Sequence, residues 1–223
     1  MTNPLITNVA IGKWYPKGQE RLFDSLVEHG WNSYKGWINE YPTQGFNESN
    51  PYTCKASALE YALQNNRDVV LWCDASIYAI KPVDELMQLV NDKGYFFWAS
   101  GENCAQTVSD RCLDIFDLSR NEAELITECA TSVFGVNLNT EIGRAFAERF
   151  IYYTAKGAAD GSRYHDNQSL DKRFKYHRQD QSVASLVMHQ LDMKIEPVRY
   201  VGYTAYLSEY QDTSKICLLN QGM

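Results

Sequence analysis

A single carboxylate, Asp74, stands at the end of an unbroken apolar run, Val69-Val-Leu-Trp-Cys73. A short polar step, Ala75-Ser76, follows, and then a second apolar run and Lys81-Pro82. A continuous apolar run predicts a strand that is buried on both faces. Open α/β sheets bind ligands beyond the carboxyl ends of their strands. Asp74 is therefore expected where a metal ion or a diphosphate could bind.

Three further segments carry polar side chains that could act with Asp74. A loop with glycine and tyrosine, residues 8–15, follows the first expected strand, and Tyr52-x-x-Lys55 lies on the helix before the central strand. Residues 130–137 lead into and include most of a later expected strand, and the polar run 177–182 comes after it. Each segment also has a purely structural reading. A lysine on a helix face is ordinarily solvated, and an aspartate such as Asp180 favours the N-terminal end of a helix through the helix dipole.

Several common catalytic signatures are absent from the sequence. It has no GxGxxG and no GxxxxGK[ST], which excludes the usual dinucleotide and P-loop fingerprints. It has no GxSxG and no HExxH, and its four histidines do not share metal-ligand spacing. A phosphatase of the Asp-x-Asp-x-Thr type needs a second carboxylate, but Ser76 and Tyr78 follow Asp74 here.

Hydrophobic periodicity predicts alternating strands and helices along the chain. This order indicates an α/β sandwich with a largely parallel sheet. No linker divides the chain, so one domain is expected. The expected strands are 5–11, 33–39, 69–73, 95–99 and 132–138, with a short strand after 194, and the expected helices are 19–29, 52–65, 83–90, 109–118, 122–128, 141–153 and 179–191.

Composition narrows the class of protein. The 223 residues are 44% hydrophobic and carry a formal net charge of −7, so a large core is expected and a nucleic-acid-binding surface is not. The six cysteines form no CxxC pair, which favours a reducing compartment. No apolar run reaches the roughly 18 residues of a membrane span, and the N-terminus lacks the features of a signal peptide. A cytoplasmic location without a membrane span is therefore expected.

Taken in order, these segments resemble the nucleotide-sugar glycosyltransferases of the GT-A fold, particularly the small bacterial galactosyltransferases and the glycogenin-like members. In that family a helix with Tyr-x-x-Arg precedes a strand that ends in Asp-x-Asp, and a later helix opens with Asp-Gln. Tyr52-x-x-Lys55, Asp74-Ala75-Ser76 and Asp180-Gln181 match these motifs in order. The resemblance covers about residues 5–192 and implies a Rossmann-like sandwich, with a donor half near residues 1–100 and an acceptor half near 101–223. More distantly, the chain resembles the capsid-modifying glycosyltransferases of large algal viruses.

The resemblance also implies roles for individual residues. Asp180 and Gln181 would lie near the anomeric carbon, where a carboxylate could act as base or stabilise an oxocarbenium-like transition state. Glu128 and Glu102 are rival carboxylates for that role. Tyr15 would stack on the nucleobase. The expected donor-binding residues are Asn8, Ala10, Gly12, Tyr15, Lys55, Asp74, Ala75, Ser76, Thr131 and Arg178.

A divalent metal, Mn²⁺ or Mg²⁺, is the cofactor that the resemblance implies, since it would stabilise the leaving diphosphate. Asp74, Ser76 and His177 are its expected ligands. Ser76 departs from the family, because a hydroxyl replaces the second carboxylate. Either the metal binds through Asp74 and diphosphate oxygens, or cationic side chains replace it. The candidate cations are Lys172, Arg173, His177 and Arg178.

The predicted activity is transfer of a sugar from a nucleotide-diphosphate donor, expected to be a UDP-sugar, to a hydroxyl of a glycan or glycoprotein. Because the second carboxylate is missing, a catalytically weak nucleotide-sugar-binding module is the main alternative. A sugar nucleotidyltransferase is a second alternative. It is disfavoured because the first loop lacks the Gly-rich, Arg-containing signature that cradles a triphosphate.

Overall fold

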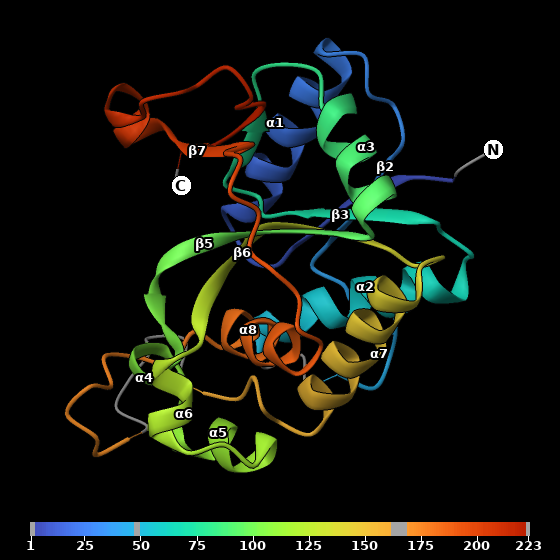
Figure 1. Ribbon diagram of the computed structural model, residues 1–223. Coiled ribbons are helices and arrows are strands. Elements are labelled where there is room, and N and C mark those ends of the chain that lie inside the picture. The colour runs from blue at the N-terminus through green and yellow to red at the C-terminus, as the bar shows by residue number, and fades with distance from the viewer. Residues whose placement is uncertain (1–2, 47–49, 162–168, 222–223) are drawn as a thin grey trace.

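A five-stranded sheet runs through the middle of the protein, with helices on both faces (Figure 1). The structure is a computed structural model that describes residues 3–46, 50–161 and 169–221. Each strand of this sheet matches one that the hydrophobic pattern predicts, within a few residues except at the start of β6 and the end of β5. In spatial order the strands are β2 (Tyr34–Ile38), β1 (Leu5–Ala10), β3 (Val69–Cys73), β6 (Thr127–Asn137) and β5 (Tyr95–Asn103).

Four of these five strands run in the same direction, as expected for a mostly parallel sheet. β1 pairs in parallel with β2 and β3, whereas β6 runs antiparallel to both β3 and β5. The reversal matters for the site. It places the first half of β6 beside the carboxyl end of β3, where the Asp74 amide donates to the Ser132 carbonyl at 2.7 Å.

Two layers of helices enclose the sheet (Figure 1). One face is covered by α1 (Tyr15–Glu28) and α3 (Asp84–Lys93). The opposite face is covered by α2 (Cys54–Gln64), α7 (Glu141–Ala155) and α8 (Asp180–Gln190). This three-layer arrangement is the predicted α/β sandwich.

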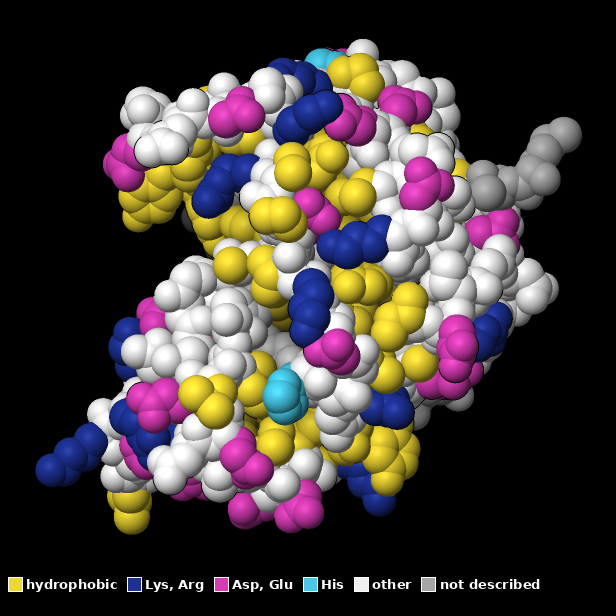
Figure 2. Space-filling view, viewed as in Figure 1, with side chains coloured by type: hydrophobic (Ala, Val, Ile, Leu, Met, Phe, Trp, Pro, Cys, Tyr) yellow, Lys and Arg dark blue, Asp and Glu magenta, His cyan; other side chains and the backbone are white. Residues whose placement is uncertain are grey.

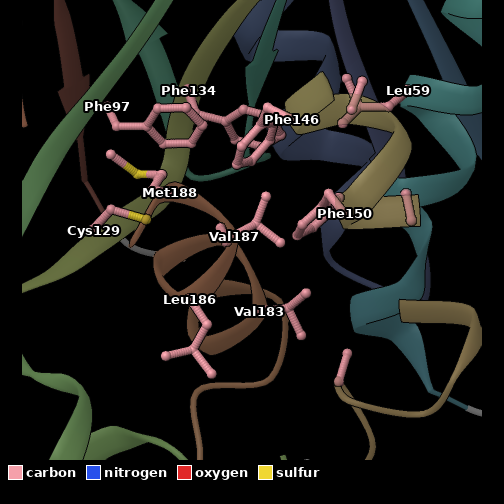
Figure 3. Packing of buried hydrophobic residues seen from close by; sticks show 14 of the residues in the cluster. Leu59, Phe97, Cys129, Phe134, Phe146, Phe150, Val183, Leu186, Val187 and Met188 are labelled. Carbon is pink, nitrogen blue, oxygen red and sulfur yellow. The ribbon is translucent and has the colours of Figure 1, made fainter. Parts of the chain in front are cut away.

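Aromatic side chains fill the space between the sheet and the α7/α8 layer (Figure 3). Phe97 and Phe134 stack across β5 and β6 with ring centroids 5.5 Å apart, and Phe146 stacks on Phe150 along α7 at 5.7 Å. All four rings are fully buried or nearly so. Burial of each such side chain stabilises the fold by about 1.5–3 kcal/mol. The same cluster includes Val183, Leu186, Val187 and Met188 of α8, so it packs that helix against β6.

A second, smaller sheet forms where the chain leaves Asp74. Its three strands are β4 (Ile77–Ala79), β8 (Leu218–Asn220) and β7 (Val201–Tyr203), in that order. Ile77 pairs with Asn220, so the C-terminal segment lies beside the turn that follows Asp74. The remaining short elements are η1 (Pro51–Thr53), α4 (Cys104–Thr107), α5 (Asp110–Phe116), α6 (Arg120–Glu124) and η2 (Thr204–Glu209).

The largest differences from the predicted element boundaries lie at α6, β6, β5 and α1. The helix expected over 122–128 is wrong in its second half: α6 ends at Glu124, and β6 begins at Thr127, which pairs with Asn103. β5 is correspondingly longer than expected. α1 begins at Tyr15, because Pro16 occupies its first turn, a position where the missing N–H costs nothing.

The six cysteines are all buried and form no disulfide. Within the described residues, no helix has both the length and the apolar character needed to cross a membrane.

Candidate functional site

Two cavities meet at the carboxyl end of β3 and share three lining residues, Tyr52, Lys55 and Asp74. The larger has a volume of about 720 Å³ and the smaller about 380 Å³. The larger is also lined by Asn8, Val9, Ile11, Gly12, Tyr15, Pro51, Cys54, Trp72, Ala75 and Gly161, and the smaller by Thr131, Ser132, Arg178, Gln179, Asp180, Gln181, Tyr203 and Asn220. Figure 2 shows a notch in the surface below the segment that contains β7, at the left of the view, with hydrophobic side chains on its upper wall.

The loop after β1 shapes the larger cavity. Gly12 has φ of +106°, a left-handed conformation that glycine adopts without strain, and its amide donates to Asn39 Oδ1 at 2.7 Å. Tyr15, at the start of α1, is half exposed beside this turn. Asn8 is fully buried: its Nδ2 donates to the Cys73 carbonyl (2.6 Å), and its Oδ1 accepts from Gln19 Nε2 (2.8 Å). Asn8 therefore joins β1 to β3, while Tyr15 offers a flat, accessible ring.

Lys55 is the centre of the site. Its Nζ lies 2.7 Å from Asp180 Oδ2 and 3.2 Å from Asp74 Oδ1. It also donates to the Thr131 carbonyl at 2.8 Å. These partners come from α8, the end of β3 and β6, so one ammonium group links three elements of the fold. Only 8% of the lysine side chain is exposed.

The other polar groups extend this network. Thr131 Oγ1 donates to Asp180 Oδ2 at 2.6 Å, and the Thr131 amide donates to Gln181 Oε1 at 3.3 Å. Arg178 Nη2 donates to the same Gln181 oxygen at 3.4 Å. Trp72 Nε1 donates to Asp74 Oδ1 at 2.7 Å. Asp74, Asp180 and Gln181 are thus held in fixed orientations before any ligand arrives.

Burial and charge act in opposite directions on the titratable groups. Burial alone would lower the pKa of Lys55, but the charges of Asp180 and Asp74 outweigh it and hold that pKa above its ordinary value. Burial raises the pKa of Asp74, and the charge of Lys55 opposes that shift. Burial, followed by the charge of Asp180, raises the pKa of Tyr52. Lys55 therefore remains a cation at neutral pH.

The structure brings together most of the residues that the sequence predicts for the site. Lys55 and Asp74 line both cavities. Ala10, Ser76 and His177 line neither. Ala10 is buried at the end of β1, and Ser76 lies in the turn after Asp74, where its carbonyl accepts from the Gln221 amide. The predicted residues on the larger cavity are Asn8, Gly12, Tyr15 and Ala75, and those on the smaller are Thr131, Arg178, Asp180 and Gln181.

The predicted metal ligands do not fit a divalent ion as a set. His177 is completely buried, and its Nδ1 accepts from the Ser109 amide at 3.1 Å. Asp74 Oδ1 already accepts from Lys55 and Trp72. Across the described ranges, no three His, Cys, Asp or Glu side chains cluster as a metal site.

The other candidate charges lie elsewhere. Arg173 pairs with Asp171 and Glu124 at 2.8 and 2.7 Å, and neither Arg173 nor Lys172 lines the two cavities. Glu102 pairs with Lys175. Glu128 is buried and accepts from Ser100 Oγ at 2.6 Å, and burial raises its pKa. Of the four cations proposed from sequence, only Arg178 lines either cavity.

Several lining residues were not among those predicted. Asn220 comes from β8, a C-terminal strand with too few residues for a periodic signal. Tyr203, on β7, is one of the tyrosines of the C-terminal tail, which the sequence offers only as general candidates for an acceptor site. Trp72 appears in sequence as one more apolar residue of the central strand. Gln179 has φ of +43° and ψ of −110°, an unusual conformation for a non-glycine residue, directly before Asp180. Such strain cannot be anticipated from a glutamine.

Comparison with known proteins supports the fold. No family model matches the chain, and no curated protein matches it. Among solved structures, it is similar to the apo structure of the bifunctional glycosyltransferase WbbM, with a TM-score of 0.59 and 12% sequence identity. The match covers 100% of this chain and 46% of that protein, so the chain spans about half of its length. The fold of the chain is therefore a glycosyltransferase-like α/β fold.

Proposed function

We propose that this chain is a glycosyltransferase that moves a sugar from a nucleotide-diphosphate donor, expected to be a UDP-sugar, to a hydroxyl of a glycan or glycoprotein. The observation that carries the proposal is the meeting of two cavities at Lys55 and Asp74. One cavity has the size and the aromatic wall for a nucleoside, and the other is rich in polar side chains. A donor that spans both would place its diphosphate near their junction.

The larger cavity is assigned to the nucleoside. Tyr15 is accessible and its ring is planar. Any nucleobase can stack on such a ring, because every base has a flat aromatic face. Val9 and Ile11 add apolar surface to the same wall. The smaller cavity is assigned to the sugar and the acceptor, since Arg178, Gln181 and Asn220 line it and offer hydrogen bonds to hydroxyl groups.

The reaction requires that one bond at the anomeric carbon break and another form. The carbon–oxygen bond to the diphosphate breaks, and the nucleoside diphosphate leaves with the electron pair. An acceptor oxygen bonds to the carbon, and its proton passes to the departing diphosphate or to water. Lys55 would stabilise the negative charge on the leaving group, because its ammonium is fixed where the two cavities join. Asp180 would stabilise positive charge on the sugar ring.

A direct test uses the intact chain and a panel of nucleotide sugars with saccharide acceptors. The expected result is a rise in melting temperature with one class of donor, and release of its nucleoside diphosphate. Absence of binding to every donor would overturn the proposal. Binding without turnover in the presence of acceptors would instead favour a nucleotide-sugar-binding module.

The variant Asp180→Asn sharpens this test. It keeps the size of the side chain but removes the charge, so turnover is expected to fall about 10²-fold or more, while donor binding is largely kept. The matched control is Asp24→Asn, which alters an exposed aspartate on α1. Equal turnover in the two variants would contradict the role of Asp180.

A further inference from the structure

The positive charge in the junction between the cavities is supplied by the protein itself. The Lys55 ammonium lies between the carboxylates of Asp74 and Asp180, which come from different elements of the fold. Its three N–H bonds are matched by those two carboxylates and by the Thr131 carbonyl. A lysine held in this way keeps its charge and its position whether or not a ligand is bound.

The same arrangement disfavours a divalent ion at Asp74. A protein magnesium or manganese site usually offers one or two carboxylates with open oxygen atoms. Here Asp74 Oδ1 already accepts from the Lys55 ammonium at 3.2 Å, and Asp180 Oδ2 accepts from it at 2.7 Å, which leaves Oδ2 as the open oxygen of Asp74, whose side chain is 34% exposed. An ion with two positive charges on the Asp74 carboxylate would lie close to this ammonium, which would repel it. The position of a second carboxylate is taken by Ser76, outside both cavities.

Arg178 provides a second cation on the wall of the smaller cavity. Its guanidinium donates to Gln181 Oε1 at 3.4 Å and forms no ion pair with any residue of the described part of the chain. An arginine without a close ion-pair partner is well suited to phosphate, which it can bind with two parallel hydrogen bonds. Lys55 and Arg178 both line this cavity, as do Asp74 and Asp180. The two positive and two negative formal charges of its lining therefore sum to zero.

We propose that this protein binds the diphosphate of its donor without a divalent metal, with Lys55 as the fixed cation and Arg178 as the phosphate-binding cation. The inference rests on the proposed function. In the transfer step, these two side chains would take up the charge that develops on the departing diphosphate. The two carboxylates hold the ammonium in place rather than binding a metal.

Calorimetric titration of the intact chain with uridine diphosphate tests this, once in excess chelator and once with Mn²⁺ or Mg²⁺. Guanosine, adenosine and cytidine diphosphates serve as parallel probes. The expected dissociation constants for the diphosphate that binds agree within about threefold with and without metal. Tightening by tenfold or more on addition of metal would overturn the metal-free site. If no diphosphate binds under either condition, the proposed function itself fails.

Two arginine variants identify the cation. Arg178→Gln is expected to weaken binding of the diphosphate about tenfold or more, but to leave binding of the corresponding nucleoside unchanged, since the nucleoside has no phosphate. The control is Arg173→Gln, which alters an arginine of the same segment that pairs with Asp171 and lines neither cavity. Equal diphosphate affinity in Arg178→Gln and the unaltered chain would contradict the assignment. Melting temperatures verify that both variants are folded.

Discussion

Lys55 and Asp180 form a buried ion pair, with 2.7 Å between Nζ and Oδ2, that joins α2 to the first residue of α8. Only 8% and 5% of the two side chains are exposed. Removing one partner of such a pair leaves a buried charge without compensation, and this typically costs about 3–5 kcal/mol. The pair is therefore expected to support the fold as well as the site.

The variant Lys55→Met tests this directly, because it leaves two carboxylates facing each other across the junction. We expect the free energy of unfolding in urea to fall by about 3–5 kcal/mol. Lys55→Met combined with Asp180→Asn should recover part of that loss. Lys17→Met, at an exposed lysine on α1, is the matched control and should change stability by less than about 0.5 kcal/mol. A loss below about 1 kcal/mol for Lys55→Met would show that the pair contributes little.

The sequence predicts only in part that Lys55, Asp74 and Asp180 lie together. The strand Val69–Cys73 is predicted at its exact limits, because five apolar residues between two aspartates are typical of a short strand buried on both faces. Lys55, Asp74 and Asp180 were grouped through the order of motifs, and the structure places both carboxylates within 3.2 Å of the lysine nitrogen. Spacing in the sequence carries no information about that distance, since it depends on how α8 packs against β6.

The sequence does not predict the burial of His177 or the position of Asn220 in the site. The resemblance makes His177 an expected metal ligand, yet its ring is buried against the Ser109 amide. Asn220 reaches the cavity through the pairing of β8 with β4, two strands of three residues each. Strands this short leave no alternating pattern, so only the folded chain reveals that they meet.

The variant Asp74→Asn separates the two ways of binding a diphosphate. Asparagine keeps an oxygen that can accept from Trp72 Nε1, but it removes one negative charge beside the expected phosphates. If Lys55 and Arg178 bind the diphosphate, its affinity measured in chelator should stay within about threefold or become tighter. If a metal bridges Asp74 to the phosphates, affinity measured with Mn²⁺ should fall tenfold or more. The second result would contradict the metal-free site.

Tyr15 is expected to form one face of the nucleobase site. Removing the ring in Tyr15→Ala should weaken binding of uridine diphosphate by about 1–3 kcal/mol, the range found when stacking on a base is lost. Tyr15→Phe should bind almost as well as the unaltered chain. Tyr152→Ala, at a tyrosine on α7 that is similarly exposed, serves as the control. Unchanged affinity in Tyr15→Ala would place the base outside the larger cavity.

Glu128 should make stability depend on pH. Its pKa is raised in the folded protein, chiefly by burial, above an ordinary value near 4.3. The unfolded chain therefore loses this proton first, and the folded state becomes less stable as pH rises from about 4 through the raised pKa. Glu128→Gln removes the titrating group, so its stability in urea relative to the unaltered chain should increase between pH 4 and pH 7, by about 1.4 kcal/mol for each unit of pKa difference. Glu20→Gln, at an exposed residue of α1, is the control. A stability difference that stays constant over this range, or that shrinks as pH rises, would show that burial does not favour the neutral form of Glu128.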